Sequence, residues 1–266
     1  MDTFRTRAMT WRLFFAQLLV MVGAASCWHG ARTSSYRPIE TISPPPAPSP
    51  APPTSRGEVT PPAIWYGSLD RGRCHEELYR RGVAFHEVTT KTPGVLAPIR
   101  LQGPVNGVVY RTELAPAKRA TVPWEVFDCR LVLALFDFSA ILRSHGIAEA
   151  LMFSAWRPPG KNWPDGQQAK RHPGALAIDI KRFRRWDGSV IDIKRDFHGR
   201  IGHTTCGDDA DPPRQATEAS YTLRAIVCQA ASWKIFNSVL TPNYDEPHQD
   251  HLHLDITAGA KWFLVR

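Results

Sequence analysis

Apolar residues with helical spacing mark three segments of the chain. A nearly uniform apolar run between Pro123 and Gly146 predicts a long, centrally buried helix, because few of its faces carry polar side chains. Cys74–Gly82 has the pattern of a short helix that its glycine ends. The periodicity of Tyr221–Leu240 predicts another long helix.

Alternating apolar and polar residues mark the predicted strands, which are 148–157, 175–183, 189–194 and 251–256. A weaker alternation, broken by Pro and Gly, covers 94–112 and predicts short strands or an arm. Asp187-Gly188 has the composition of a hairpin turn between two of the strands. Strands that return through hairpins beside packed helices predict an α+β fold with a mainly antiparallel sheet.

Two of these strands carry polar residues that can build a site. In 175–183 the apolar side chains point to one face and Asp179 to the other, because side chains alternate along a strand. In 251–256 His253 is opposite to the apolar residues in the same way. His172 comes seven residues before Asp179. If the two strands are neighbours in the sheet, His172, Asp179 and His253 converge.

Two imidazoles and one carboxylate suit Zn²⁺ and leave a fourth position for water. Such a site lowers the pKa of bound water and polarises a carbonyl group, as amide hydrolysis requires. Asp250 and His251 are the candidates for a general base, and His248 for a residue that supports the ligands or the transition state. The alternative is a set of structural histidines, since either half of the pattern occurs by chance in a chain with ten histidines.

The N-terminus has the pattern of an export signal. Residues 1–26 combine arginines, an apolar run and small residues, which predicts a signal peptide, with an uncleaved anchor as the alternative. Cys27 follows small residues, as in a bacterial lipoprotein signal. Lipid on Cys27 and ordinary cleavage nearby are both open. Residues 27–63 are rich in Pro and predict a disordered or extended linker, followed by a folded domain over 64–266.

Four cysteines remain in the predicted domain, and an even number in an exported chain suggests two disulfides. Three pairings exist, and the sequence does not choose among them. We favour Cys74–Cys129 and Cys206–Cys228, because each bond closes a loop inside one half of the domain. The alternative is that some of the four are buried free thiols.

The chain has 266 residues, 43% of them hydrophobic, and can bury one or two cores. Its net charge is +8, and the first 43 residues supply +3 of it through five arginines against Asp2 and Glu40. The remaining charge is compatible with an anionic wall or membrane surface. Without a basic-aromatic stripe or a Gly-rich phosphate loop in the sequence, we expect no nucleic-acid partner.

Three motifs resemble those of the LAS zinc peptidases, which include D-Ala-D-Ala carboxypeptidases, L-Ala-D-Glu endopeptidases and the hedgehog domain. They are Ser154-Ala-Trp-Arg157, His172-Pro-Gly-Ala-Leu-Ala-Ile-Asp179 and Asp250-His251-Leu-His253. The chain is more closely similar to the bacterial extensin-like C-terminal domain over about residues 68–256, through Cys74-x-x-x-Leu, Gly82 and Val239-Leu-Thr-Pro-Asn-Tyr244 among others. The LAS group usually has a glycine three residues after the first ligand, where this chain has Ala175.

The resemblance implies a hedgehog or D-Ala-D-Ala-peptidase-like fold with His172, Asp179 and His253 as zinc ligands. It implies Asp250 as the base with His251 beside it, and Arg157 as a group that stabilises the oxyanion or binds a substrate carboxylate.

The expected function is an exported zinc peptidase of the periplasm or cell envelope, DD- or LD-peptidase-like, that hydrolyses an amide bond in peptidoglycan stem peptides or crosslinks. The alternative is a non-catalytic envelope protein that binds or tethers peptidoglycan. Either protein would be a membrane-anchored lipoprotein if Cys27 carries lipid.

Overall fold

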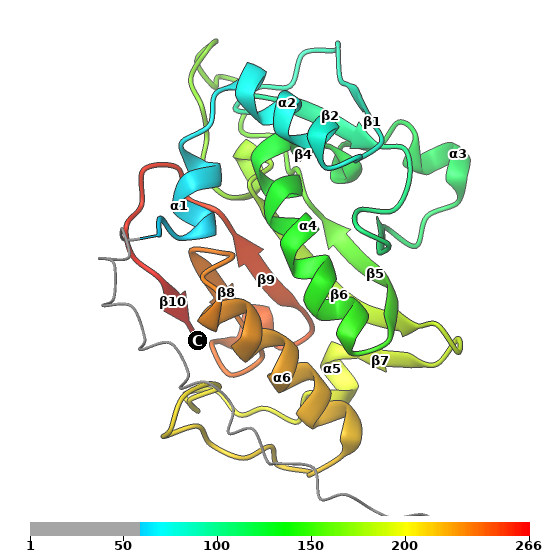
Figure 1. Cartoon of the computed structure of the whole chain (residues 1–266), viewed down its shortest axis with the longest axis vertical. Helices are drawn as coiled ribbons and strands as arrows, with labels where there is room; N and C mark the ends of the chain where they lie inside the picture. The colour runs from blue at the N-terminus through cyan, green and yellow to red at the C-terminus, as the bar shows by residue number, and fades with distance from the viewer. Residues whose placement is uncertain (1–58) are drawn as a thin grey trace, which may run out of the picture. The chain divides into compact units, whose positions relative to one another are not determined.

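The computed structural model describes residues 59–266, which form a mixed α+β fold with two sheets (Figure 1). Six α-helices and three short 3-10 helices lie in this part of the chain. They are α1 (Pro62–Gly67), α2 (Arg71–Arg80), α3 (Pro116–Arg119), η1 (Pro123–Glu125), α4 (Cys129–Ser144), η2 (His172–Gly174), α5 (Ile193–Asp196), α6 (Glu218–Ser232) and η3 (Glu246–His248).

Ten strands form the two sheets. They are β1 (Phe85–Glu87), β2 (Pro98–Leu101), β3 (Val109–Arg111), β4 (Phe127–Asp128), β5 (Ile147–Ser154), β6 (Ala177–Arg185), β7 (Val190–Asp192), β8 (Ser238–Leu240), β9 (Leu252–Asp255) and β10 (Leu264–Val265). The smaller sheet is antiparallel, with the order β1-β2-β4. The larger has the order β10-β8-β9-β6-β5-β3, and β7 also pairs with β6. It is mixed, because β3 with β5 and β10 with β8 are parallel pairs.

One face of the larger sheet forms the core. Figure 1 shows α4 and α6 lying side by side across it. Ile178 and Ile180 of β6 and Leu252 and Leu254 of β9 have no exposed surface, and they share one hydrophobic cluster with the apolar residues of both helices. The alternation predicted for these two strands is therefore confirmed. It leaves the opposite face of β6 and β9 for polar side chains.

Several predicted elements have different bounds in the structure. The long helix begins at Cys129 rather than Pro123, because Pro123–Glu125 forms a 3-10 turn and Phe127–Asp128 pairs with β2. The helix predicted over Tyr221–Leu240 ends at Ser232. The last three residues of the predicted range, Ser238–Leu240, form β8 instead. All three residues of β8 are buried, and the strand is too short to show an alternation that would separate it from a helix. The Asp187-Gly188 hairpin is confirmed, with Gly188 at φ 85°.

Both favoured disulfides are present, joining Cys74 to Cys129 and Cys206 to Cys228. The first joins α2 to α4, and the second joins α6 to the loop that precedes it. Helix α1 begins at Pro62, two residues before the predicted domain start. The predicted signal peptide, Cys27 and most of the predicted linker lie outside the described residues. Within 59–266, no helix combines the length and the apolar character needed to cross a membrane.

A buried ion pair joins the smaller sheet to α4. Asp128 caps α4 by accepting a hydrogen bond from the Arg130 amide, and it accepts two more from the Arg130 guanidinium, at 2.8 and 3.0 Å. The amides of Leu96 and Ala97 also donate to Asp128, each at 3.2 Å. The Asp128 and Arg130 side chains are only 0% and 3% exposed. Each charge thus depends on the other for its solvation.

Replacement of Asp128 should be far more destabilising than replacement of an exposed helix cap. We expect Asp128→Ala to lower the free energy of unfolding by about 3–5 kcal/mol, because it leaves the Arg130 charge buried without its partner. Asp70→Ala is the control, since Asp70 caps α2 at 2.9 Å with a side chain that is 67% exposed. Its expected cost is about 1 kcal/mol. Urea titration measures both, and equal costs would contradict the role given to the buried pair.

Candidate metal centre

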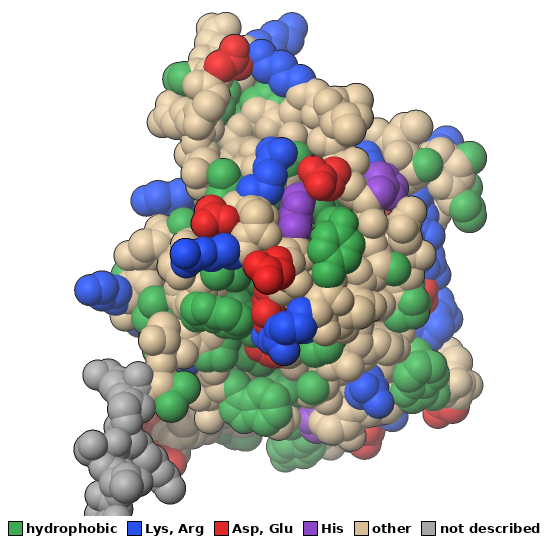
Figure 2. All heavy atoms as spheres, turned by 45° about the horizontal axis from the view of Figure 1, so that its top comes forward, with side chains coloured by type: hydrophobic (Ala, Val, Ile, Leu, Met, Phe, Trp, Pro, Cys, Tyr) green, Lys and Arg blue, Asp and Glu red, His purple; other side chains and the backbone are tan. Residues whose placement is uncertain are grey.

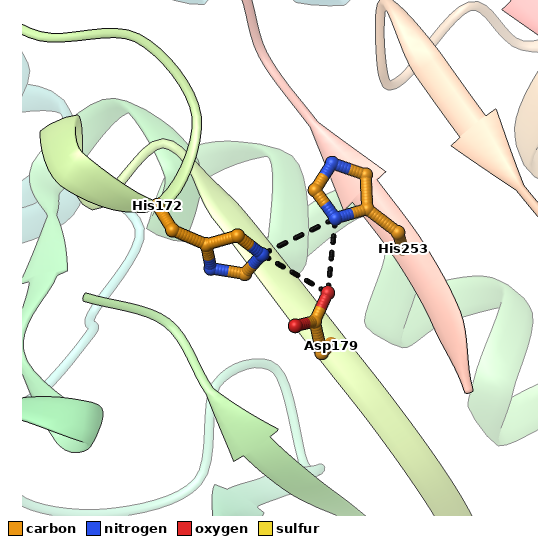
Figure 3. A group of neighbouring side chains, drawn as sticks. All are labelled: His172, Asp179 and His253. Atoms are coloured by element: carbon orange, nitrogen blue, oxygen red, sulfur yellow. Dashed lines mark hydrogen bonds and ion pairs between the residues drawn. The ribbon is translucent and has the colours of Figure 1, made fainter. Parts of the chain in front are cut away.

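His172, Asp179 and His253 come together on the polar face of the larger sheet (Figure 3). Antiparallel pairing of β6 with β9 places Asp179 directly opposite His253. Asp179 Oδ1 lies 2.9 Å from His253 Nδ1 and 3.0 Å from His172 Nε2, and the two ring nitrogens are 3.2 Å apart. All three side chains are buried, with 5 to 8% exposed. The convergence expected from the strand alternation is therefore present.

The outer nitrogen of each imidazole also has a partner. His172 Nδ1 lies 2.8 Å from the carbonyl oxygen of Ala155, and His253 Nε2 lies 3.1 Å from Asp255 Oδ2. Because a carbonyl oxygen only accepts, His172 Nδ1 carries the proton and Nε2 turns a lone pair towards the other two residues. Asp255 has no exposed surface and also accepts a hydrogen bond from Thr257 Oγ1 at 3.0 Å. These contacts hold both rings in one orientation.

Asp255 is a site residue that the sequence analysis did not select. It lies two residues after His253 on the same strand, so both side chains point to the same face of the sheet. That spacing was the available signal, since a histidine that binds a metal usually donates its second nitrogen to a carboxylate or carbonyl oxygen.

Charge in the cluster is arranged around Asp179. Burial disfavours its ionised form, but its contacts with the imidazoles of His172 and His253 outweigh burial and hold the pKa of Asp179 far below its ordinary value. Burial lowers the pKa of His172 in spite of its contact with Asp179. For His253 burial acts in the same direction, but hydrogen bonds to Asp179 and Asp255 raise its pKa above the ordinary value. The carboxylates of Asp179 and Asp255, one at each nitrogen of the His253 ring, thus favour its protonated, positively charged form.

The turn that carries His172 has an unusual backbone. Arg171 has φ 48° and ψ −138°, and Ala175 has φ 52°, so two residues with a Cβ adopt conformations that favour glycine. Gly174 is needed for a different reason, because a Cβ on it would lie 2.2 Å from the carbonyl oxygen of Ala169. The turn therefore packs directly against the segment before it.

The candidate base residues lie beside the cluster. His251 Nε2 is 3.5 Å from Asp179 Oδ1, and its Nδ1 is 2.8 Å from Asp250 Oδ1. His251 thus turns one nitrogen to the cluster, while Asp250 contacts the other and is 44% exposed. His248 bonds to Asp245, and its ring centroid is 5.1 Å from that of His251. His248 therefore packs beside the ring of His251.

Arg157 contacts the carboxylate oxygen of Asp179 that the two histidines do not contact. Its Nη2 donates a hydrogen bond to Asp179 Oδ2 at 2.6 Å, and its side chain is 54% exposed. The rest of its guanidinium makes no hydrogen bond with residues 59–266. Figure 2 shows a face of the domain on which histidine, acidic and basic side chains lie next to one another. Arg157 can therefore contact both a buried carboxylate and a molecule that arrives from solvent.

The donor set of the cluster fits zinc. Zn–N and Zn–O bonds of about 2.0–2.2 Å at tetrahedral angles place neighbouring donor atoms about 3.3 Å apart. Separations of 2.9, 3.0 and 3.2 Å between the three donors require only small outward shifts to reach that spacing. In residues 59–266, this is the one group of three or more His, Cys, Asp or Glu side chains with spacing suitable for a metal ion.

The chain belongs to the extensin-like protein C-terminus family, whose model matches residues 73–266. That range contains all three residues of the cluster together with Arg157, Asp250 and Asp255. No curated protein and no solved structure matches the chain significantly.

Gly174 provides a test of the tight turn that carries His172. We expect Gly174→Ala to lower the free energy of unfolding by about 1–3 kcal/mol, because the added methyl group collides with backbone atoms of Ala169. Gly160→Ala is the matched control, since Gly160 lies in the same connection between β5 and β6 and a Cβ on it would meet no atom within 4 Å. Thermal unfolding compares the two variants. A Gly174→Ala chain as stable as the control would contradict the close packing.

Proposed function

We propose that this protein is a zinc-dependent peptidase of the bacterial cell envelope that hydrolyses an amide bond in peptidoglycan stem peptides or crosslinks. The observation that carries the proposal is the convergence of His172, Asp179 and His253 with both outer imidazole nitrogens already bound to oxygen acceptors. Metal-binding histidines usually have such a partner for the second nitrogen, and here the inner nitrogens of both rings also meet one carboxylate oxygen. The domain would then have a hedgehog or D-Ala-D-Ala-peptidase-like fold.

Zinc bound by these three residues supplies Lewis-acid activation of a water molecule and a carbonyl group. Residues of this chain supply the proton transfers. The resemblance implies Asp250 as the base, but His251 is the residue that turns a nitrogen to the cluster. In the proposal His251 therefore accepts a proton from the attacking water at Nε2 and later donates it to the leaving amine. Asp250 binds Nδ1 of His251, which holds the ring in orientation and stabilises its protonated form.

Arg157 has two roles in the proposal. One nitrogen holds Asp179 through Oδ2, so that Oδ1 remains turned to the two histidines. The remaining N–H groups bind the oxygen on which negative charge develops, or a carboxylate of the substrate. An exposed, always-charged guanidinium beside a buried carboxylate suits both roles.

Features of the whole chain support an envelope substrate. The N-terminal pattern predicts export, and the two disulfides of the domain are stable in an oxidising compartment. The charge of +5 that remains beyond residue 43, from +8 for the chain and +3 for residues 1–43, is compatible with an anionic wall or membrane surface. The motif resemblance to the LAS zinc peptidases adds the substrate class. In the proposal the Pro-rich segment, with lipid on Cys27 where that modification occurs, keeps the domain near the wall.

Zinc binding is the first part of the proposal to test. We expect the purified full chain to bind one zinc ion, and His172→Ala and His253→Ala to abolish tight binding, because each removes a ligand. Asp255→Asn should weaken zinc binding about 10–100-fold through the changed partner of His253. Asp192→Asn is the control, since Asp192 contacts Arg182 away from the cluster. Competition with a zinc chelator measures the affinities. A folded wild type that binds no added zinc would overturn the proposal.

Catalysis is the second part to test. We expect His251→Ala to lower kcat for hydrolysis of peptidoglycan fragments by about 10²–10⁴-fold and leave zinc content unchanged, because the proton acceptor is lost. Asp250→Asn should lower kcat less, since the imidazole remains. Glu246→Gln, in the same turn, is the control. Product analysis by mass spectrometry identifies the bond that is cut. A wild-type chain that binds zinc and peptidoglycan but cuts no bond would instead favour the non-catalytic binding protein.

A further inference from the structure

A cavity of about 500 Å³ is lined by the basic residues Lys194, His198, Arg200 and Arg214. Phe197, Ile201 and Pro242 are among its apolar wall residues, and no carboxylate lines it. Gln249 also lines the cavity and lies in the chain between His248 and Asp250. The cavity therefore adjoins the turn that carries the candidate base residues.

The cations of this cavity have no acidic partners. Lys194, Arg200 and Arg214 form no ion pair with residues 59–266, and their side chains make no hydrogen bond there. Elsewhere in the domain many arginines are paired with carboxylates, including Arg111, Arg182 and others on the exposed face of the sheet. Like charges gathered without compensation raise the local potential and attract anions.

The cavity wall is fixed by the backbone. The Arg214 amide donates to the carbonyl oxygen of His198 at 2.8 Å, which joins the two ends of the loop between α5 and α6. The Arg200 amide donates to Asn243 Oδ1, also at 2.8 Å. A Cβ on Gly199 would lie 2.4 Å from that same oxygen, so the contact requires a glycine. Segments from three parts of the chain thus hold the basic side chains around one space.

Arg224 adds a further positive charge behind this wall. Its guanidinium lies over the ring of Phe197, 4.8 Å from the centroid, and Phe197 lines the cavity. Arg224 is only 8% exposed, and none of its three side-chain nitrogens has a hydrogen-bond partner among the described residues. Asp211 is close enough to act on its charge but makes no hydrogen bond with it, so a bound anion nearby would offset part of the cost of burying this cation.

We propose that this cavity, lined by Lys194, Arg200 and Arg214, binds an anionic group, carboxylate or phosphate, of the ligand that occupies the candidate metal centre. The assignment of one shared ligand rests on the proposed function; the anion site itself does not. Arg200 and Arg214 offer planar guanidinium groups that match both kinds of oxyanion. The apolar residues of the wall contact the adjoining carbon atoms of the ligand.

Direct binding measurements test the cavity without relying on catalysis. The probes are inorganic phosphate, acetyl-Ala-Glu-Ala and the uncharged acetyl-Ala-Gln-Ala-amide, titrated by calorimetry at low ionic strength into the full chain. We expect Arg200→Ala and Arg214→Ala each to weaken binding of whichever anionic probe the cavity accepts, phosphate or the glutamyl peptide, about tenfold. Lys118→Ala is the control, because Lys118 is an exposed lysine without an ion pair that does not line the cavity. Thermal unfolding verifies that the variants remain folded.

The outcomes distinguish a carboxylate from a phosphate as the bound group, and they do not depend on whether the chain is a peptidase. Weaker binding of the glutamyl peptide in the variants assigns the cavity to carboxylates, and weaker binding of phosphate alone assigns it to a phosphate-bearing ligand. Either result supports the anion site, whether or not the chain proves to have peptidase activity. Equal binding of all probes by wild type and the Lys194, Arg200 and Arg214 triple alanine variant would overturn it.

Discussion

The antiparallel pairing of β6 with β9 is the interaction on which the rest of this structure depends. In its register, Asp179 is opposite His253, and Ile178 is opposite Leu254. The apolar residues point to α4 and α6, where their burial stabilises the fold, while the polar residues meet on the other face. A shift by one residue would exchange the two faces of a strand, placing Asp179 in the core. Stability and site geometry therefore select the same register.

Buried carboxylates recur in the domain, and they serve different purposes. Asp128 is surrounded by donors from Arg130 and two backbone amides, so its charge is satisfied within the fold. Asp179 and Asp255 instead converge on the single ring of His253. Arg157 and Arg171 also contact these two carboxylates, but from solvent-exposed side chains, and the inner oxygen of Asp179 stays turned to the two imidazoles. This contrast distinguishes a structural ion pair from the candidate metal centre.

The strands of the site were the most predictable part of the fold. Alternation placed Asp179 and His253 on polar faces, because one face of each strand must be buried and the pattern has a period of two. The ends of helices were less predictable. Phe127–Asp128 and Ser238–Leu240 looked helical in the sequence, and their strand conformation depends on pairing with β2 and with β9. Such pairings join residues that are distant in the chain, so local propensity does not reveal them.

The sequence by itself determined which residue types could form a metal centre and which face of each strand would carry them, since both follow from chemistry and local geometry. Only the tertiary structure decided that Ala155 and Asp255 bind the outer nitrogens of the two imidazoles, because those contacts depend on side-chain orientation and on segments brought together by folding. The same holds for the basic cavity, where the backbone amides of Arg200 and Arg214 are held by distant partners, Asn243 and His198. Local pattern defines what each residue can do, and long-range packing decides with which partners it does so.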